Sequence, residues 1–181
     1  MGIDKLSGFL SINSALGQKP IDLKGEKVGL LPSGNGNVSI VNKPGFGETL
    51  ITGIGQGFMQ VTPMQLARAT ATLANQGQVV TPYIAERIVD DSREIAVKHS
   101  PATNIELKSA NVQDIIGAMI HVVHSARGTA KRIAKDMDFK VAGKTGTAQV
   151  FTVKQDEEYN EEEIAFNMRD HALFIVFPNI G

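Results

Sequence analysis

KVAGKTGTAQV, residues 140–150, is a run of small and β-branched residues interrupted by a lysine, two threonines and a central glycine. The run predicts a strand, which we expect to extend over residues 139–151. Side chains alternate along a strand, so Thr145 and Thr147 would share one face. Two hydroxyls one strand repeat apart, with an ammonium beside them, can bind a carboxylate, and Gly146 leaves room for a ligand backbone. Because an edge strand can also pair with an extended peptide, this stretch suits the capture of a peptide that ends in a free carboxylate.

A second strand and two amphipathic helices are predicted on either side of this stretch. Residues 171–177 are apolar on both faces, which is typical of a central strand covered by helices. Apolar residues recur at helical spacing over residues 3–16, and Gly17 is placed to end that helix. Another apolar stripe predicts a helix that Ser109 caps and that ends near Gly128.

The clearest helix signal is VTPMQLARATATLANQG, residues 61–77. Thr62 is placed as the N-cap, Pro63 fits the first helical position, and Gln65 completes a capping box. Gly77 stands where a left-handed residue ends a helix. We expect the packing face to be the small, mostly apolar one, which is formed by Leu66, Ala69, Thr70, Leu73 and Ala74.

The remaining segments indicate loops and a hairpin. Residues 18–52 read as a loop, with PSGNGN at residues 32–37 the part with the least predicted structure. A strand is expected over residues 79–89, followed by a turn at residues 90–92 and a short returning strand at residues 94–97. Strands joined by hairpins and accompanied by helices predict an α+β fold, in which an antiparallel sheet packs with helices. The length of 181 residues fits one domain.

Composition excludes several classes of function. The formal net charge of −1 gives no nucleic-acid signal, and the acidic run at residues 156–163 is best read as a solvated surface. The absence of cysteine excludes disulfides, thiolate metal sites and a cysteine nucleophile. The longest apolar run, ALFIVF at residues 172–177, is too short to cross a bilayer.

Motifs for nucleotides and metals are incomplete. Residues 143–145 spell the end of a phosphate-binding loop, but Asp138 stands where that loop needs glycine. The glycines at residues 53–57 lack the third glycine of a dinucleotide fingerprint. His121 and His124 can share a helix face, although a third ligand is not evident. We therefore predict no cofactor and no metal.

Lys144-Thr145-Gly146 is also the third motif of penicillin-binding proteins and class A β-lactamases. The segments GIGQGFMQVTPMQLARATATLANQGQVVTPYI, RGTA, GKTGTAQV and YNEEEIAFNMRDHALFIVF resemble class B penicillin-binding proteins, above all the elongation-specific members. The resemblance runs over essentially the whole chain, in family order. It implies that residues 1–181 are part of a transpeptidase (penicillin-binding) domain with a penicillin-binding-protein/β-lactamase-like fold, truncated at both ends.

The resemblance also implies a reaction and its residues. Members of the family cross-link D-Ala-D-Ala stem peptides through a serine acyl-enzyme, and β-lactams acylate the same serine. By this resemblance Lys144 and Thr147 are catalytic, with the Thr147 N–H as one oxyanion-hole donor, and Thr145, Gly146 and Thr147 bind substrate. The Ser-x-x-Lys that carries the nucleophile occurs nowhere in the 181 residues. We therefore expect this chain to be inactive on its own.

Partners and location follow from the same resemblance. Peptidoglycan stem peptides and β-lactam antibiotics are the expected ligands, and proteins of the cell-elongation machinery are the expected partners. The complete protein would work at the periplasmic face of the bacterial inner membrane, attached through a segment absent from this sequence. Two alternatives stay open: a non-catalytic peptide-carboxylate-binding or assembly module, and a serine β-lactamase-like hydrolase. A Ser-x-x-Lys upstream would favour an enzyme over the binding module.

Overall fold

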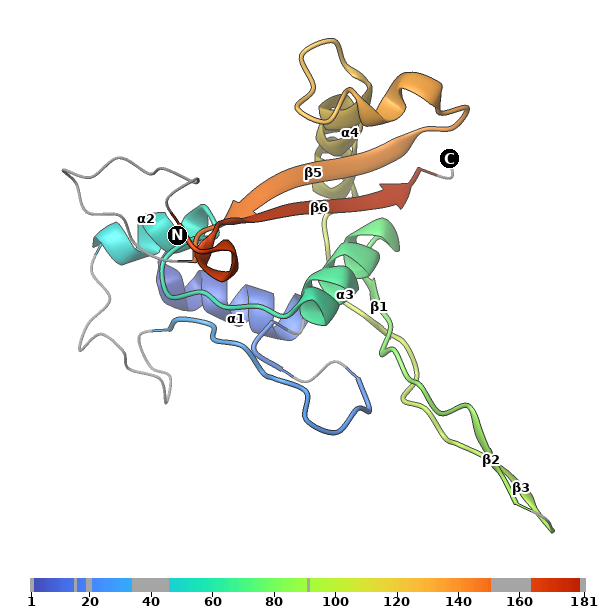
Figure 1. Cartoon of the computed structure of the whole chain (residues 1–181). Helices are drawn as coiled ribbons and strands as arrows, with labels where there is room; N and C mark the ends of the chain where they lie inside the picture. Colours follow the sequence, from blue (N-terminus) through green and yellow to red (C-terminus); the bar gives the residue numbers. More distant parts are fainter. Residues whose placement is uncertain are drawn as a thin grey trace. The chain divides into compact units, whose positions relative to one another are not determined.

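The computed structural model describes residues 2–14, 16–18, 21–33, 46–90, 92–150 and 164–179. Its longer elements are the helices α1 (Ile3–Ser14), α2 (Phe46–Gly53), α3 (Pro63–Ala74) and α4 (Ser109–His124), and the strands β5 (Val141–Ala148) and β6 (His171–Pro178) (Figure 1). Its shorter elements are β1 (Gln78–Val79), β2 (Arg87–Val89), β3 (Glu94–Ala96), β4 (Thr103–Asn104) and the 3-10 turns η1 (Ile133–Asp136) and η3 (Phe166–Met168). The chain divides into two compact units, Met1–Ile116 and Gly117–Gly181. Within the described residues, every helix is too short or too polar to cross a membrane.

Helix α3 confirms its predicted ends. The Thr62 side chain accepts from the Gln65 backbone N–H, Pro63 begins the helix, and Gly77 has a φ of 102°. These signals are local, because each one acts on a backbone group of the helix end beside it: Thr62 accepts a free N–H, and Pro63 has no N–H to leave unpaired. The packing face differs from the predicted apolar one: the buried residues of α3 are Gln65 and Thr72.

Gln65 explains this difference. Its side chain is fully buried, and its Nε2 donates to the carbonyl of Gln18 at 2.6 Å and to that of Val28 at 2.9 Å. Its Oε1 accepts from the Thr62 N–H at 2.9 Å. One side-chain amide thus completes the helix cap and holds the two ends of a loop. Its NH2 group and its oxygen each have hydrogen-bond partners, so burying it leaves no donor unpaired.

Helix α2 was not predicted, because residues 18–52 read as a loop. It is short, it contains β-branched residues and glycines, and its contacts with α1 stabilise it where propensity alone does not. Helix α1 also contacts α3, and it confirms the helix predicted over residues 3–16. Residues 34–37, most of the PSGNGN stretch, lie outside the described residues.

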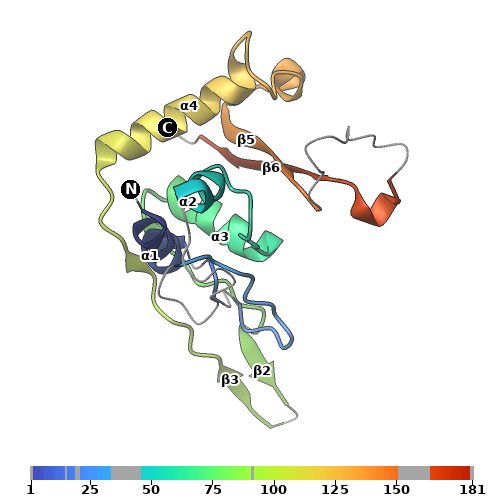
Figure 2. The ribbon, with the colours of Figure 1, turned by 90° about the vertical axis from the view of Figure 1, so that its left-hand side faces the viewer.

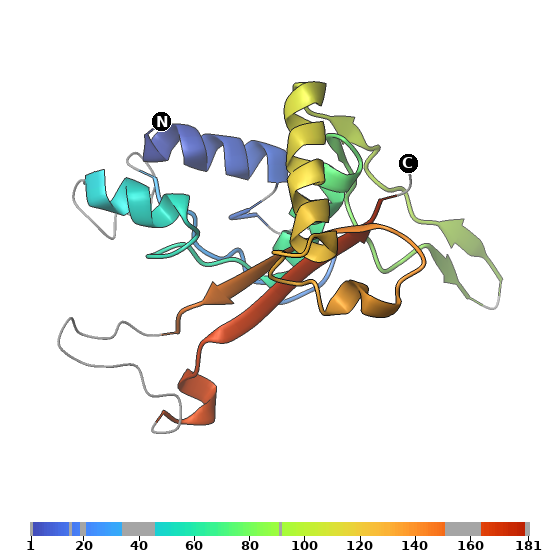
Figure 3. The same ribbon diagram turned by 90° about the horizontal axis from the view of Figure 1, so that it is seen from above.

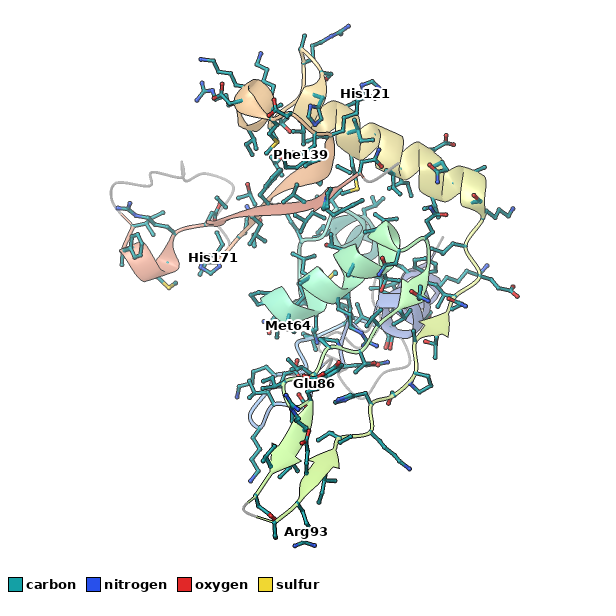
Figure 4. The ribbon with its side chains drawn as sticks, turned by 90° about the vertical axis from the view of Figure 1, so that its right-hand side faces the viewer. Met64, Glu86, Arg93, His121, Phe139 and His171 are labelled. Carbon is teal, nitrogen blue, oxygen red and sulfur yellow. The ribbon has the colours of Figure 1, made fainter. Side chains whose placement is uncertain are left out.

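The strand predicted over residues 79–89 is wrong as one continuous element. Only Gln78–Val79 and Arg87–Val89 are extended strands, and β1 pairs with β4, which the sequence did not indicate. Strands β2 and β3 form the expected antiparallel hairpin, with Arg93 at its tip (Figures 2 and 4). The carboxylate of Asp90 accepts from the N–H groups of Ser92 and Arg93, and these hydrogen bonds, that of Ser92 first, lower the pKa of Asp90.

Strands β5 and β6 pair antiparallel over their full length, from Val141 opposite Pro178 to Ala148 opposite His171 (Figure 3). This confirms both predicted strands and the α+β class with antiparallel pairing. The prediction that β6 is a covered central strand is wrong for the described residues. There β6 pairs only with β5, and Leu173, Phe174 and Val176 are exposed.

The core of the second unit lies where the end of α4 meets β5. Val123, Ala130 and Val141 are buried together, with Val122, Ala134 and Met137 packed against them. Val123 comes from α4, Ala130 from the turn after it, and Val141 from the first position of β5. Burying these aliphatic groups fixes the helix end, the turn and the strand as one body.

Candidate active site

The main-chain groups of β5 point alternately toward β6 and away from it. The carbonyl of Lys140 accepts from Asn179, which follows β6, whereas the N–H of Val141 donates to Nε2 of His124 at 3.0 Å. Residues opposite each other in an antiparallel pair alternate in this way. The N–H and C=O groups of Thr145 and Thr147 are therefore directed away from β6. No second strand pairs with β5 in the part of the chain that the structure describes.

The motif side chains lie at this unpaired edge. Lys144, Gly146 and Thr147 are exposed and Thr145 is half-buried. Alternation places Lys144 on the face opposite to the two threonines, yet its Nζ curls back to donate to the Thr145 carbonyl at 2.6 Å. The ammonium thus reaches the edge of β5, next to the hydroxyl-bearing face.

The two glycines of the stretch have different surroundings. A Cβ at Gly143 would lie 2.8 Å from Cζ of Phe174 and 3.0 Å from Cγ2 of Val123. A Cβ at Gly146 would meet only Cβ of Leu173, at 3.8 Å, an ordinary van der Waals contact. A side chain at Gly143 would therefore have to displace the Phe174 ring and the buried Val123 side chain, whereas one at Gly146 would make only an ordinary contact among the described residues.

His124 has a structural contact of its own. It stands at the end of α4, and its Nε2 accepts the N–H of Val141. His121, three residues earlier, is exposed. Among the described residues no group of three His, Cys, Asp or Glu side chains could hold a metal.

Thr129 reaches this site and was missed by the reasoning from sequence. Its Oγ1 lies 3.1 Å from Oγ1 of Thr145, within hydrogen-bond distance. The sequence carried only an indirect signal, the RGTA segment after a helix, which marks a turn and does not say what that turn approaches.

The comparisons decide the family. The penicillin binding protein transpeptidase domain matches residues 1–175. The chain belongs to this family. Two relatives named peptidoglycan D,D-transpeptidase MrdA are similar over 98% of the chain, at 32% identity in Haemophilus influenzae and at 33% in Escherichia coli K12. The chain spans 28% of the length of either relative.

Solved penicillin-binding protein structures share the fold. PBP2 of Pseudomonas aeruginosa, in complex with WCK 5153, is 39% identical with a TM-score of 0.76, covering 97% of this chain and 36% of its own. PBP2 of Helicobacter pylori, in complex with MreC, is 28% identical with a TM-score of 0.75, covering 98% of this chain and 30% of its own. The transpeptidase fold is therefore shared along nearly the whole chain.

Proposed function

We propose that this chain is part of a peptidoglycan D,D-transpeptidase that cross-links stem peptides through a serine acyl-enzyme and binds β-lactams. Family membership and relatives that carry this name support the proposal. The observation that carries it is the edge of β5 that pairs with no strand among the described residues, where an exposed lysine, two threonines and outward-directed amides stand together. This edge has the donors that a peptide carboxylate and a developing oxyanion need.

Each residue has a role in this proposal. The hydroxyls of Thr145 and Thr147 hold the terminal carboxylate of the stem peptide. The N–H of Thr147 points away from β6 and serves as one oxyanion-hole donor, a group whose loss typically costs about 100- to 1,000-fold in rate. Gly146 lets the ligand backbone approach, since the nearest described atom to the space of its missing side chain is Cβ of Leu173 at 3.8 Å.

Lys144 supplies positive potential and supports proton transfer near the nucleophile. In the part of the chain that the structure describes, its ammonium donates to the neighbouring carbonyl of Thr145, and a short swing of the flexible side chain redirects it to a reacting group. The serine belongs to a part of the complete protein outside these 181 residues, which hold no Ser-x-x-Lys.

Labelled penicillin tests the proposal on the complete protein. Lys144→Ala should lower the rate of covalent labelling at least tenfold, because the charged side chain acts at the site and not in the core. Lys140→Ala is the matched control, an exposed lysine at the start of the same stretch, and should label normally. Unchanged labelling of Lys144→Ala would remove this residue from the mechanism.

The same experiment separates the alternatives. The 181-residue chain alone should not be labelled, and covalent labelling of it would contradict the placement of the nucleophile elsewhere. A complete protein that binds acyl-D-Ala-D-Ala peptides without covalent labelling would be a binding module. Fast release of hydrolysed penicillin from a labelled protein would identify a β-lactamase-like hydrolase.

Partners and location belong to the proposal as well. The Helicobacter pylori PBP2 structure contains MreC, which supports a role for this protein beside the cell-elongation machinery. Cross-linking of stem peptides then takes place at the periplasmic face of the inner membrane. Co-purification of the complete protein with MreC from its own source tests the partner, and failure to co-purify at low salt counts against it.

A further inference from the structure

The turn that follows α4 is built around one close approach. A Cβ at Gly128 would overlap the carbonyl oxygen of Val122, so only glycine allows the chain to fold back there. The N–H of Gly128 donates to Ser125 O at 3.0 Å, and the N–H of Ala130 donates to Val122 O at 3.0 Å. These bonds satisfy carbonyls at the helix end and fix the backbone on both sides of Thr129.

Ala130 fixes the turn on its other side. Its side chain is 5% exposed and packs with Val123 and Val141. Thr129, between the tight glycine and the buried alanine, is exposed, so packing does not require its side chain. Its hydroxyl lies 3.1 Å from the hydroxyl of Thr145. A rigid turn thus holds one hydroxyl against the site.

We propose that Thr129 is a positioning residue that orients the Thr145 hydroxyl toward the substrate carboxylate. The inference rests on the proposed function. Either hydroxyl of this pair can be the donor. Thr145 has a single hydroxyl proton, and a carboxylate only accepts, so that proton goes to the substrate. Thr129 then donates to Thr145, and the two hydroxyls form a chain that ends on the carboxylate, in which each bond strengthens the next.

The test compares a labelled penicillin with its methyl ester, which keeps the β-lactam and loses the negative charge. The unchanged complete protein should be acylated faster by the acid. Thr129→Val should reduce the preference for acid over ester about three- to tenfold, which corresponds to the loss of the one hydrogen bond from Thr129 to Thr145. Thr129→Ser, which keeps the hydroxyl, should restore the preference.

Controls separate positioning from folding. Thr103→Val changes an exposed threonine of β4 and should leave the preference unchanged. Thr145→Val should reduce the preference at least as much as Thr129→Val, and the double variant should add little, because both act on one chain of hydrogen bonds. Thermal melting of each variant checks folding, and Thr129→Ala serves if Thr129→Val melts early.

Two results would overturn the inference and are distinguishable. If Thr129→Val slows acid and ester by the same factor, or leaves both unchanged, Thr129 does not orient Thr145, while the proposed function stands. If neither reagent labels the unchanged protein, the proposed function fails and this inference fails with it.

Discussion

At the scale of single residues, the stretch at residues 140–150 combines two kinds of constraint. Gly143 is constrained by packing, since the side chains of Val123 and Phe174 lie where its own side chain would be. Thr145, Gly146 and Thr147 are the residues that we propose bind a ligand; Gly146 and Thr147 are exposed and Thr145 is half-buried. The sequence predicted a binding role for Gly146 from its position between two threonines, whereas it gave no sign that Gly143 touches a helix.

Alanine should lower the stability of the fold at Gly143 and the rate of penicillin labelling at Gly146. Gly143→Ala forces the ring of Phe174 and the Val123 side chain apart and should lower the free energy of unfolding by about 1–3 kcal/mol. Gly146→Ala should change it by about 0.5 kcal/mol or less, since its Cβ makes an ordinary contact, while slowing penicillin labelling by crowding the ligand. Chemical denaturation and labelling of the complete protein measure both. A labelling rate that Gly146→Ala leaves unchanged would place the ligand elsewhere.

At the scale of elements, what could be predicted depended on whether a signal was local. The N-cap of α3 lies next to the helix in sequence and was predicted, whereas at the other end the left-handed conformation begins at Gln76, with a φ of 54°, one residue before the predicted Gly77. Strands β5 and β6 were predicted from their residue pattern. The exposure of β6 depends on which strands it pairs with, and that pairing could not be read from the pattern. Helix α2, the pairing of β1 with β4 and the contact of Thr129 with Thr145 depend on residues distant in sequence, so no local pattern announced them.

Gln65 shows how much one such contact stabilises an element. Gln65→Leu fits the volume but leaves the carbonyls of Gln18 and Val28 and the N–H of Thr62 without their partner. We expect a loss of about 1–3 kcal/mol, the cost of roughly one unsatisfied buried group, because Gln18 and Val28 are themselves exposed residues.

The matched control for that variant is Gln113→Leu, an exposed glutamine of α4. It should change the free energy of unfolding by about 0.5 kcal/mol or less. Urea denaturation compares the two variants, and equal effects would mean that water replaces the Gln65 amide without loss.

At the scale of the whole molecule, the chain divides into two units and spans 28% of its relatives. Strand β6 has exposed apolar side chains and pairs on one side only within the described residues. An unpaired strand edge with such side chains favours association with other chains. Whether residues 1–181 are a domain truncated at both ends stays a prediction.

We expect the isolated 181-residue chain to self-associate as its concentration rises. Val176→Lys, at a position 45% exposed on β6, should reduce that association because charge opposes edge pairing. Sedimentation velocity over a concentration series measures the effect, with Lys98→Arg as a control that keeps the charge at an exposed loop residue. A chain that remains monomeric throughout would show that this edge is protected.

Because the backbone groups of β5 alternate in direction, the number of residues from Val141 to Thr147 sets which way the Thr147 N–H is directed. Val141 is anchored to His124, and Thr147 stands three two-residue steps further along the same row of outward groups. Inserting or deleting one residue between Val141 and Thr145 would turn the N–H of Thr147 toward β6 and move both threonine hydroxyls to the opposite face. The number of residues between the His124 contact and Thr147 therefore fixes which backbone groups of β5 are directed away from β6.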